Sequence, residues 1–166
     1  VALASFCTEV PRDQAEAPLR LKVLVDCSGS MNGDSMEAAR RALHRIFAGL
    51  TSADRFTLSR FGSSVCHDVV ALTAATTEGI RVAAGHLSAM TADLGGTEME
   101  DALRSVFALG GTEAAADVLL ITDGEEHGLM GARALMEDPE VRARLKTFIN
   151  LEAIGTDSPF VLFETG

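Results

Sequence analysis

A carboxylate and two hydroxyls alternate along one short stretch of the chain, at Asp26, Ser28 and Ser30. They follow an apolar run, residues 21–25, that is typical of a buried strand. Gly29 allows the backbone to turn tightly, so the three side chains can converge. All three offer oxygen donors only, which hard cations such as Mg²⁺, Mn²⁺ and Ca²⁺ prefer, whereas softer metals favour Cys and His. The pattern predicts a divalent-metal site on a turn.

Two later motifs have the same chemical character. Leu-Gly-Gly-Thr ends in the hydroxyl of Thr97, and the apolar run Leu-Leu-Ile-Thr leads into the carboxylate of Asp123. Taken in order with the Asp-x-Ser-x-Ser motif at Asp26, these pieces resemble the von Willebrand factor A domains over about residues 20–124. The resemblance is closest to the bacterial A domains that follow an inter-alpha-trypsin-inhibitor-like module.

This resemblance implies a metal-ion-dependent adhesion site. In that family the residues matching Ser28, Ser30 and Thr97 contact the ion, and those matching Asp26 and Asp123 often act through water. A hydroxyl-rich shell leaves the ion under-neutralised, so a carboxylate from a protein partner completes its coordination. We therefore expect a non-catalytic, metal-dependent protein-binding module that uses Mg²⁺, or else Mn²⁺ or Ca²⁺.

A rival interpretation of the same turn makes Ser28 or Ser30 a nucleophile. The turn lacks the Gly-x-Ser-x-Gly elbow, and no histidine has a spacing that commends it as a base. A lone histidine is more often a structural residue than a ligand. We interpret the four histidines in this way: His44, His67, His86 and His127.

After Gly124 the sequence follows a different pattern. The runs Glu-Glu-His-Gly-Leu-Met-Gly-Ala and Asn-Leu-Glu resemble the di-zinc aminopeptidases over about residues 123–166. Carried over from that family, Glu125 is a general base, and Glu126 and Glu152 are zinc ligands. The alternative function is therefore a fragment or relative of a Zn²⁺-dependent aminopeptidase, fused to an A-like segment.

The aminopeptidase constellation is incomplete in this chain. The upstream His-x-Asp, the bridging aspartate and the final histidine of that family are all missing. Three glutamates without an imidazole hold zinc poorly, so we expect no peptidase activity. Glu125 and Glu126 also suit a helix start, where carboxylates face the positive end of the helix dipole.

Apolar periodicity predicts strands that alternate with helices. Strands are expected at residues 20–26, 54–61, 65–72 and 116–122, and helices at residues 34–50, with Asp34 or Ser35 as the cap, 77–88 and 98–109. Such alternation implies an α/β fold: a doubly wound, mostly parallel sheet with helices on both faces and one antiparallel edge strand. Ligands bind at the carboxyl ends of such strands, where Asp26 and Asp123 fall.

We expect three parts within one domain. Residues 1–19 form an arm or the remnant of a preceding module, residues 20–124 form the A-like core, and residues 125–166 form a tail that completes the same sheet. The tail would contribute a helix at residues 129–145, a strand at 146–154 and a short strand at 160–163. The seam near residues 122–125 indicates a chimera of two families.

Composition excludes some functions. A net charge of −10 and a pI near 4.8 argue against nucleic-acid binding, and no run reaches the ~20 apolar residues that span a membrane. Trp and Tyr are absent, so a protein partner would be held by metal and polar contacts more than by aromatic anchors. Three cysteines, Cys7, Cys27 and Cys66, suggest reduced thiols and favour the cytoplasm. The stretch from Val1 to Cys7 is too short and uncharged to be a whole signal peptide, and an export signal could precede it.

Overall fold

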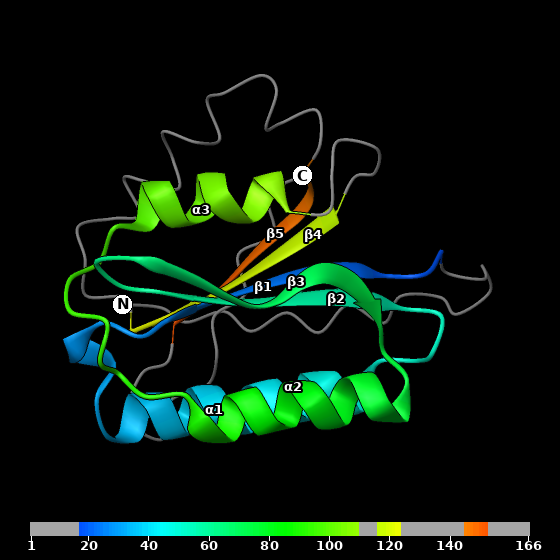
Figure 1. Ribbon diagram of the computed structural model, residues 1–166, viewed down its shortest axis with the longest axis horizontal. Helices are drawn as coiled ribbons and strands as arrows, with labels where there is room; N and C mark the ends of the chain where they lie inside the picture. The colour runs from blue at the N-terminus through cyan, green and yellow to red at the C-terminus, as the bar shows by residue number, and fades with distance from the viewer. Residues whose placement is uncertain (1–16, 110–115, 124–144, 153–166) are drawn as a thin grey trace, which may run out of the picture.

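An open five-stranded sheet lies between two helical layers in the computed structural model (Figure 1). The structure describes residues 17–109 and 116–123, and the backbone of residues 145–152. Its strands are β1 (Arg20–Asp26), β2 (Arg55–Phe61), β3 (Val65–Ala74), β4 (Ala116–Thr122) and β5 (Leu145–Glu152). Its helices are the short 3-10 helix η1 (Gly29–Met31), α1 (Asp34–Gly49), α2 (Thr77–Ala89) and α3 (Met99–Ala108).

The strands lie in the order β3-β2-β1-β4-β5, with β1 at the centre. β1 pairs in parallel with β2 and β4, β5 pairs in parallel with β4, and β3 runs antiparallel to β2 at the edge. This is the mostly parallel α/β sheet with one antiparallel edge strand that the sequence predicts. Because β1, β2 and β4 point the same way, the residues that follow β1 and β4 emerge at one end of the sheet.

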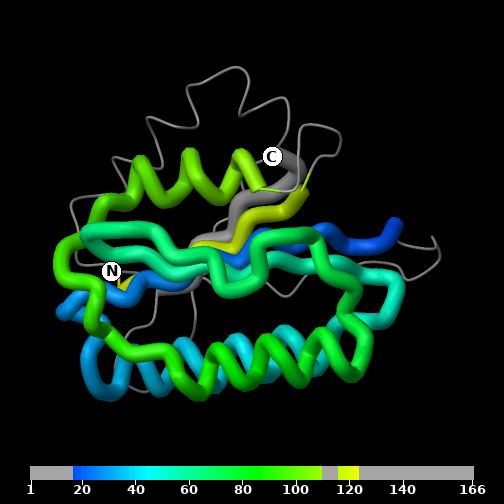
Figure 2. Tube along the Cα trace, in the orientation of Figure 1, coloured from blue at the N-terminus to red at the C-terminus, as the bar shows by residue number. Residues whose placement is uncertain are grey.

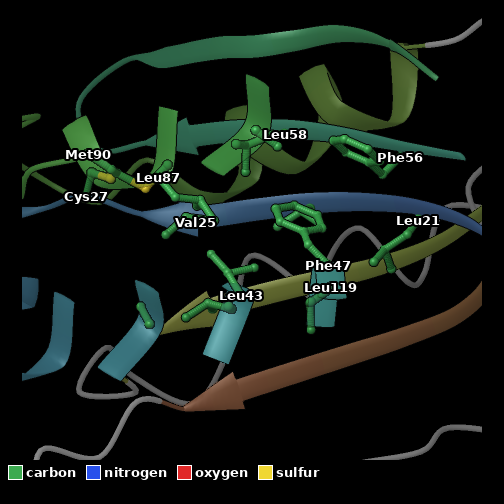
Figure 3. Packing of buried hydrophobic residues seen from close by; sticks show 14 of the residues in the cluster. Leu21, Val25, Cys27, Leu43, Phe47, Phe56, Leu58, Leu87, Met90 and Leu119 are labelled. Atoms are coloured by element: carbon green, nitrogen blue, oxygen red, sulfur yellow. The ribbon is translucent and has the colours of Figure 1, made fainter. Parts of the chain in front are cut away.

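Helices cover both faces of the sheet, with α1 and α2 on one side and α3 on the other (Figure 1). The larger core cluster packs beneath the sheet against α1 and α2, and includes Val25, Phe47 and Leu87 (Figure 3). A second cluster packs Leu24 and Phe61 against α3. β1 contributes to both clusters, which explains why its sequence is a continuous apolar run rather than an alternating one.

Two predicted boundaries differ from the structure. Neither Asp34 nor Ser35 caps α1, because the helix already includes Asp34 and its N-cap residue is Gly33. Gly33 has a φ of 80°, a backbone conformation that glycine adopts without steric cost, so the chain enters the helix without a side-chain cap. The edge strand β3 also continues two residues further than predicted, to Ala74.

Part of the C-terminal tail joins the sheet. The strand predicted at residues 146–154 is β5, which pairs with the whole of β4. The predicted arm before residue 17, the helix at 129–145 and the strand at 160–163 lie outside the described residues. None of the helices in the described part of the chain combines the length and apolar character needed to cross a bilayer.

Candidate metal-binding turn

Asp26 closes β1, and its buried carboxylate receives hydrogen bonds from two directions. The backbone N–H of Ser28 donates to Oδ1 at 2.8 Å, and the hydroxyl of Thr122 donates to Oδ2 at 2.9 Å. The first bond folds the chain back over the strand end, and the second ties the ends of β1 and β4 together. Asp26 therefore organises the turn as well as offering its own charge.

The two serine hydroxyls meet above this carboxylate. Ser28 Oγ and Ser30 Oγ lie 3.0 Å apart, within hydrogen-bond distance. Ser28 is buried and Ser30 is exposed, so the pair leads from the interior to the surface. Although Ser28 occupies the N-cap position of η1, its hydroxyl makes no capping bond to the backbone. Both oxygens are thus directed at each other rather than used to satisfy the helix end.

The loop that carries Thr97 is fastened to this turn through the backbone. Gly29 N–H donates to the carbonyl of Gly95 at 3.0 Å, and Leu94 N–H donates to the carbonyl of Cys27 at 3.0 Å. Gly95 has a φ of 80°, which permits the sharp reversal. In Figure 1 the η1 turn and the segment that joins α2 to α3 lie at the same end of the sheet.

The β2–β3 turn supports the other side of the same loop. Gly96 N–H donates to Ser63 Oγ at 2.8 Å, and Glu98 N–H donates to the carbonyl of Gly62 at 2.9 Å. These bonds fix the residues on both sides of Thr97. A Cβ on Gly62 would lie 2.5 Å from the carbonyl oxygen of Leu94, so only glycine allows this approach.

Burial disfavours the negative charge of the Asp26 carboxylate. Desolvation raises the pKa of the Asp26 carboxyl above its usual value, although the bonds from Ser28 and Thr122 act in the opposite direction. The nearby carboxylate of Asp123 raises the pKa further, which places Asp123 within electrostatic reach of Asp26. Burial likewise raises the pKa of the Cys27 thiol to about 12, so this cysteine stays protonated and inert.

The predicted residues are placed to different degrees. Asp26, Ser28 and Ser30 are joined by hydrogen bonds or adjacency, Asp123 follows β4 beside them, and Thr97 approaches through its loop. Glu125 and Glu126 lie outside the described residues, and Glu152 is placed only as the backbone partner of Thr122 in the β4–β5 ladder. Among the residues described, no three His, Cys, Asp or Glu side chains form a group that could hold a metal.

Three residues that hold the turn and the loop of Thr97 in place were not predicted from the sequence: Thr122, Ser63 and Gly62. Thr122 is a polar residue at the end of a buried strand, and that contrast was a usable signal for an internal hydrogen bond. Ser63 and Gly62 belong to the short turn between the strands predicted at residues 54–61 and 65–72. They contact a loop more than thirty residues away along the chain, and no local sequence pattern predicts such a contact.

His67 has a structural role, as expected. Its Nδ1 and Nε2 each lie 2.8 Å from a serine hydroxyl, those of Ser59 on β2 and Ser105 on α3. The ring thereby links the edge of the sheet to the helix above it. Both ring nitrogens are used in this bridge, which leaves neither for a metal.

Comparison with known proteins identifies the fold family. The profile of the von Willebrand factor type A domain matches residues 21–126, well over half of the chain. The chain belongs to this family. The A-domain match begins with β1 and ends just after β4, so it contains all three motifs of the turn.

Relatives and solved structures agree with this assignment. A von Willebrand factor A domain-containing protein of Dictyostelium discoideum is 32% identical over 103 residues, which are 61% of this chain and 11% of that protein. The chain thus spans only about a tenth of the length of that curated relative. A von Willebrand factor type A structure from Catenulispora acidiphila has a TM-score of 0.63 at 23% identity, covering 81% of this chain and 32% of that one. The pilus adhesin SpaC from Lactobacillus rhamnosus GG has a TM-score of 0.52 at 24% identity, and the match covers 67% of this chain and 15% of the adhesin chain.

A second profile overlaps the first. Peptidase family M28 matches residues 103–166, less than half of the chain. Its match begins about twenty residues before the predicted start of the aminopeptidase resemblance, inside α3, and therefore includes all of β4. The two matches overlap over residues 103–126, which include most of α3 and all of β4.

Proposed function

We propose that this chain is a divalent-metal-dependent protein-binding module, non-catalytic, whose site comprises Asp26, Ser28, Ser30, Thr97 and Asp123. Ser28, Ser30 and Thr97 offer neutral oxygens to the metal. Asp26 and Asp123 hold the surrounding negative charge that keeps it in place. When bound, Mg²⁺ supplies a positive charge that a carboxylate of the partner can approach from solvent.

The separation of the two serine hydroxyls carries the proposal. Oxygens at adjacent corners of an octahedron with ~2.1 Å metal–oxygen bonds lie about 3.0 Å apart. Ser28 Oγ and Ser30 Oγ are 3.0 Å apart. The donors are all oxygen, which also suits hard cations such as Mg²⁺.

Electrostatics gives independent support. Asp26 is 1% exposed and close to a second carboxylate, and its pKa is raised by desolvation. A buried negative charge needs compensation, and within the described residues the groups that donate to this carboxylate belong to Ser28 and Thr122 and are all neutral. A divalent cation beside Ser28 would offset the repulsion between Asp26 and Asp123.

A protein partner follows from the shape and charge of the site. Neutral hydroxyls leave most of the ionic charge uncompensated, and Ser30 stands exposed beside them. A side-chain carboxylate from another protein meets this need directly. The fold likeness to the pilus adhesin SpaC agrees with a role in protein–protein interaction. Because β5 belongs to the same sheet as β1–β4, we also propose that residues 125–166 complete the A-like domain.

The proposal is tested by isothermal calorimetry with Mg²⁺. Ser30→Ala removes one exposed hydroxyl that bonds to Ser28 in the described part of the chain, and it should weaken Mg²⁺ binding at least tenfold without loss of fold. Ser52→Ala is the matched control, since Ser52 is an exposed serine at the other end of the sheet. Equal Mg²⁺ affinity in the wild type and Ser30→Ala would contradict the proposed site.

The match to Peptidase family M28 supports a second candidate, a zinc aminopeptidase-like fragment. Its residues are Glu125 as general base and Glu126 and Glu152 as Zn²⁺ ligands. Under this alternative, Zn²⁺ binds with an affinity that Glu126→Gln weakens and Ser30→Ala leaves unchanged. Hydrolysis of leucine p-nitroanilide by the Zn²⁺-loaded chain would favour the peptidase, and its absence together with Mg²⁺ binding favours the module.

A further inference from the structure

The peptide group between Gly95 and Gly96 is hydrogen-bonded at both of its ends. Its carbonyl accepts from Gly29 N–H at 3.0 Å, and its N–H donates to Ser63 Oγ at 2.8 Å. Gly29 belongs to the turn after β1, and Ser63 belongs to the turn between β2 and β3. Figure 2 shows these two turns and the segment that joins α2 to α3 at the same end of the sheet. One peptide group therefore links the turn of the proposed metal site to a neighbouring turn, and we call it the peptide bridge.

Ser63 holds this loop through its side chain, unlike the other residues of the two turns. The remaining hydrogen bonds between residues 94–98 and the turns join backbone atoms; they link Leu94 to Cys27, Leu94 to Ser63, Gly95 to Gly29 and Glu98 to Gly62. Such bonds form whichever side chain stands at the position, whereas the bond to Gly96 needs a hydroxyl at residue 63. Among the described residues, no other side chain hydrogen-bonds to residues 94–98.

The fit between Ser63 and the peptide bridge is close. A Cβ added to Gly95 would lie 2.9 Å from Ser63 Oγ, and one added to Gly96 would lie 3.3 Å from it. Because neither glycine has a Cβ, the backbone on both sides of the bridge has more accessible conformations than at other residues. The orientation of the bridge therefore depends on the hydrogen bonds at its two ends.

Thr97 follows the peptide bridge directly, so the orientation of the bridge decides where this residue lies. Within the described residues, the Thr97 hydroxyl takes part in no hydrogen bond that would fix its position independently. Mg²⁺ demands near-octahedral geometry from its ligands, so a displaced hydroxyl binds it less well. A loop that is already ordered also avoids the entropic cost of becoming ordered when the ion binds.

We propose that Ser63 is a positioning residue of the metal site: its hydroxyl holds the peptide bridge and thereby places Thr97 for the ion. Ser63 acts through Thr97 and does not contact the metal. The effect of Ser63 on Mg²⁺ affinity rests on the proposed function of the site, but its hold on the peptide bridge does not.

The peptide bridge is tested first without metal, by exchange of backbone amide hydrogens with water in ¹⁵N-labelled protein in EDTA. Ser63→Ala should speed the exchange of Gly96 about fivefold, the factor expected for one hydrogen bond, and the exchange of Gly29 should rise with it. Ser64→Ala is the matched control, because this exposed neighbour bonds to Gly62 through its backbone carbonyl. Wild-type exchange at either Gly96 or Gly29 in Ser63→Ala would overturn the proposal.

Calorimetric titration with Mg²⁺ then measures the effect on the site. Ser63→Ala should weaken Mg²⁺ binding about fivefold and keep the fold, because water can accept from the exposed Gly96 N–H. Ser63→Thr retains the hydroxyl and should bind Mg²⁺ within about twofold of wild type, as should Ser64→Ala. Wild-type affinity in Ser63→Ala, or an equal loss in Ser63→Thr, would reject the role of the hydroxyl.

Double variants separate positioning of Thr97 from general support of the fold. Ser63→Ala should cause no further loss of Mg²⁺ affinity in a Thr97→Ala background, but should still cost about fivefold in a Ser30→Ala background. An equal loss in both backgrounds would contradict action through Thr97. If the wild type bound no Mg²⁺ while Gly96 and Gly29 exchanged faster in Ser63→Ala, the proposed function would fail and the peptide bridge would stand.

Discussion

Two aspartates at opposite ends of the sheet meet contrasting environments. Asp54, just before β2, accepts hydrogen bonds from Leu19 N–H at 2.8 Å and from the N–H and hydroxyl of Thr51 at 2.7 and 2.8 Å. These donors lower the pKa of its carboxyl. Asp26, the last residue of β1, is buried and accepts hydrogen bonds from the backbone N–H of Ser28 and the hydroxyl of Thr122, and its pKa is raised.

The difference separates a structural carboxylate from one suited to binding. The protein satisfies Asp54 with its own donors, so this residue fastens the start of β1 to the turn before β2 and needs nothing further. The charge of Asp26 is disfavoured by the same protein that places it. Perturbed ionisable groups gather at functional sites because catalysis or binding uses the imbalance, and Asp26 has that character.

The largest expected effects on stability come from substituting two glycines, one at each end of the sheet. A Cβ on Gly62 would lie 2.5 Å from Leu94 O, and one on Gly79 would lie 2.4 Å from Ala74 O. Gly62→Ala and Gly79→Ala should each destabilise the fold by about 3 kcal/mol, since backbone must move in both. Urea denaturation measures both losses.

Metal binding then distinguishes the two glycine variants. Gly62→Ala displaces the loop of Thr97 and should weaken Mg²⁺ binding. Gly79→Ala disturbs the start of α2, at the end of the sheet that carries Asp54, and should leave the Mg²⁺ affinity of the folded protein unchanged. Equal Mg²⁺ affinities in the two variants would mean that the loop of Thr97 is not part of the site.

A pair of isosteric variants tests the two aspartates directly. In EDTA, Asp54→Asn should lose about 1 kcal/mol of stability, because the amide cannot accept at both former oxygens. Asp26→Asn should be at least as stable as wild type, because it removes a buried charge and the Thr122 hydroxyl can accept from the new NH₂. When Mg²⁺ is added at 100 times the wild-type Kd, the free energy of unfolding of wild type and of Asp54→Asn should each rise by about 2.7 kcal/mol. That of Asp26→Asn should not change. Thermal unfolding with and without Mg²⁺ reads both outcomes, and a full Mg²⁺ gain in Asp26→Asn would refute the role of Asp26.

The acid dependence of stability should have opposite signs at the two residues. The folded-state pKa of Asp54 is lowered, so its stabilising contribution is present above the unfolded pKa near 3.8 and is lost as pH falls through the folded pKa. That of Asp26 is raised, so its contribution is present below about pH 3.8 and is lost as pH rises through the folded pKa. The stability difference between wild type and Asp54→Asn should therefore shrink below about pH 4. A constant difference from pH 3 to 7 would contradict this.

The smallest effect concerns thiol reactivity at the end of the sheet that carries Asp26. Cys27 is fully buried and its pKa is raised to about 12, so it should resist alkylation by iodoacetamide at pH 8 in the native protein. The partly exposed Cys66 should react first. Peptide mass spectrometry after a short pulse gives the order, and early modification of Cys27 would show that the turn opens in the native state.

The arrangement of the sheet could be predicted because its signals are local. The apolar run at residues 20–26 and the strand at 116–122 coincide with β1 and β4, and parallel topology then places Asp26 and Asp123 at one end. Family motifs supplied the candidate residues. The α1 cap was predicted wrongly, because Asp34 has the right side chain but Gly33 adopts the positive φ that starts the helix.

What the sequence did not reveal depends on contacts between distant segments. Thr122 bonds to Asp26 across 96 residues, and Ser63 bonds to Gly96 across 33. No periodicity or motif encodes such pairs, since each depends on how separate elements are brought together by packing.

The most direct test of the account is paramagnetic broadening by Mn²⁺, measured on ¹⁵N-labelled protein. Sub-stoichiometric Mn²⁺ should first broaden the amide signals of Ser28, Ser30 and Thr97, and leave those of Thr51 and Asp54 sharp. Excess Mg²⁺ should restore the broadened signals. Broadening centred on Glu126 and Glu152, or spread evenly over the acidic surface, would contradict a metal site on the turn after β1.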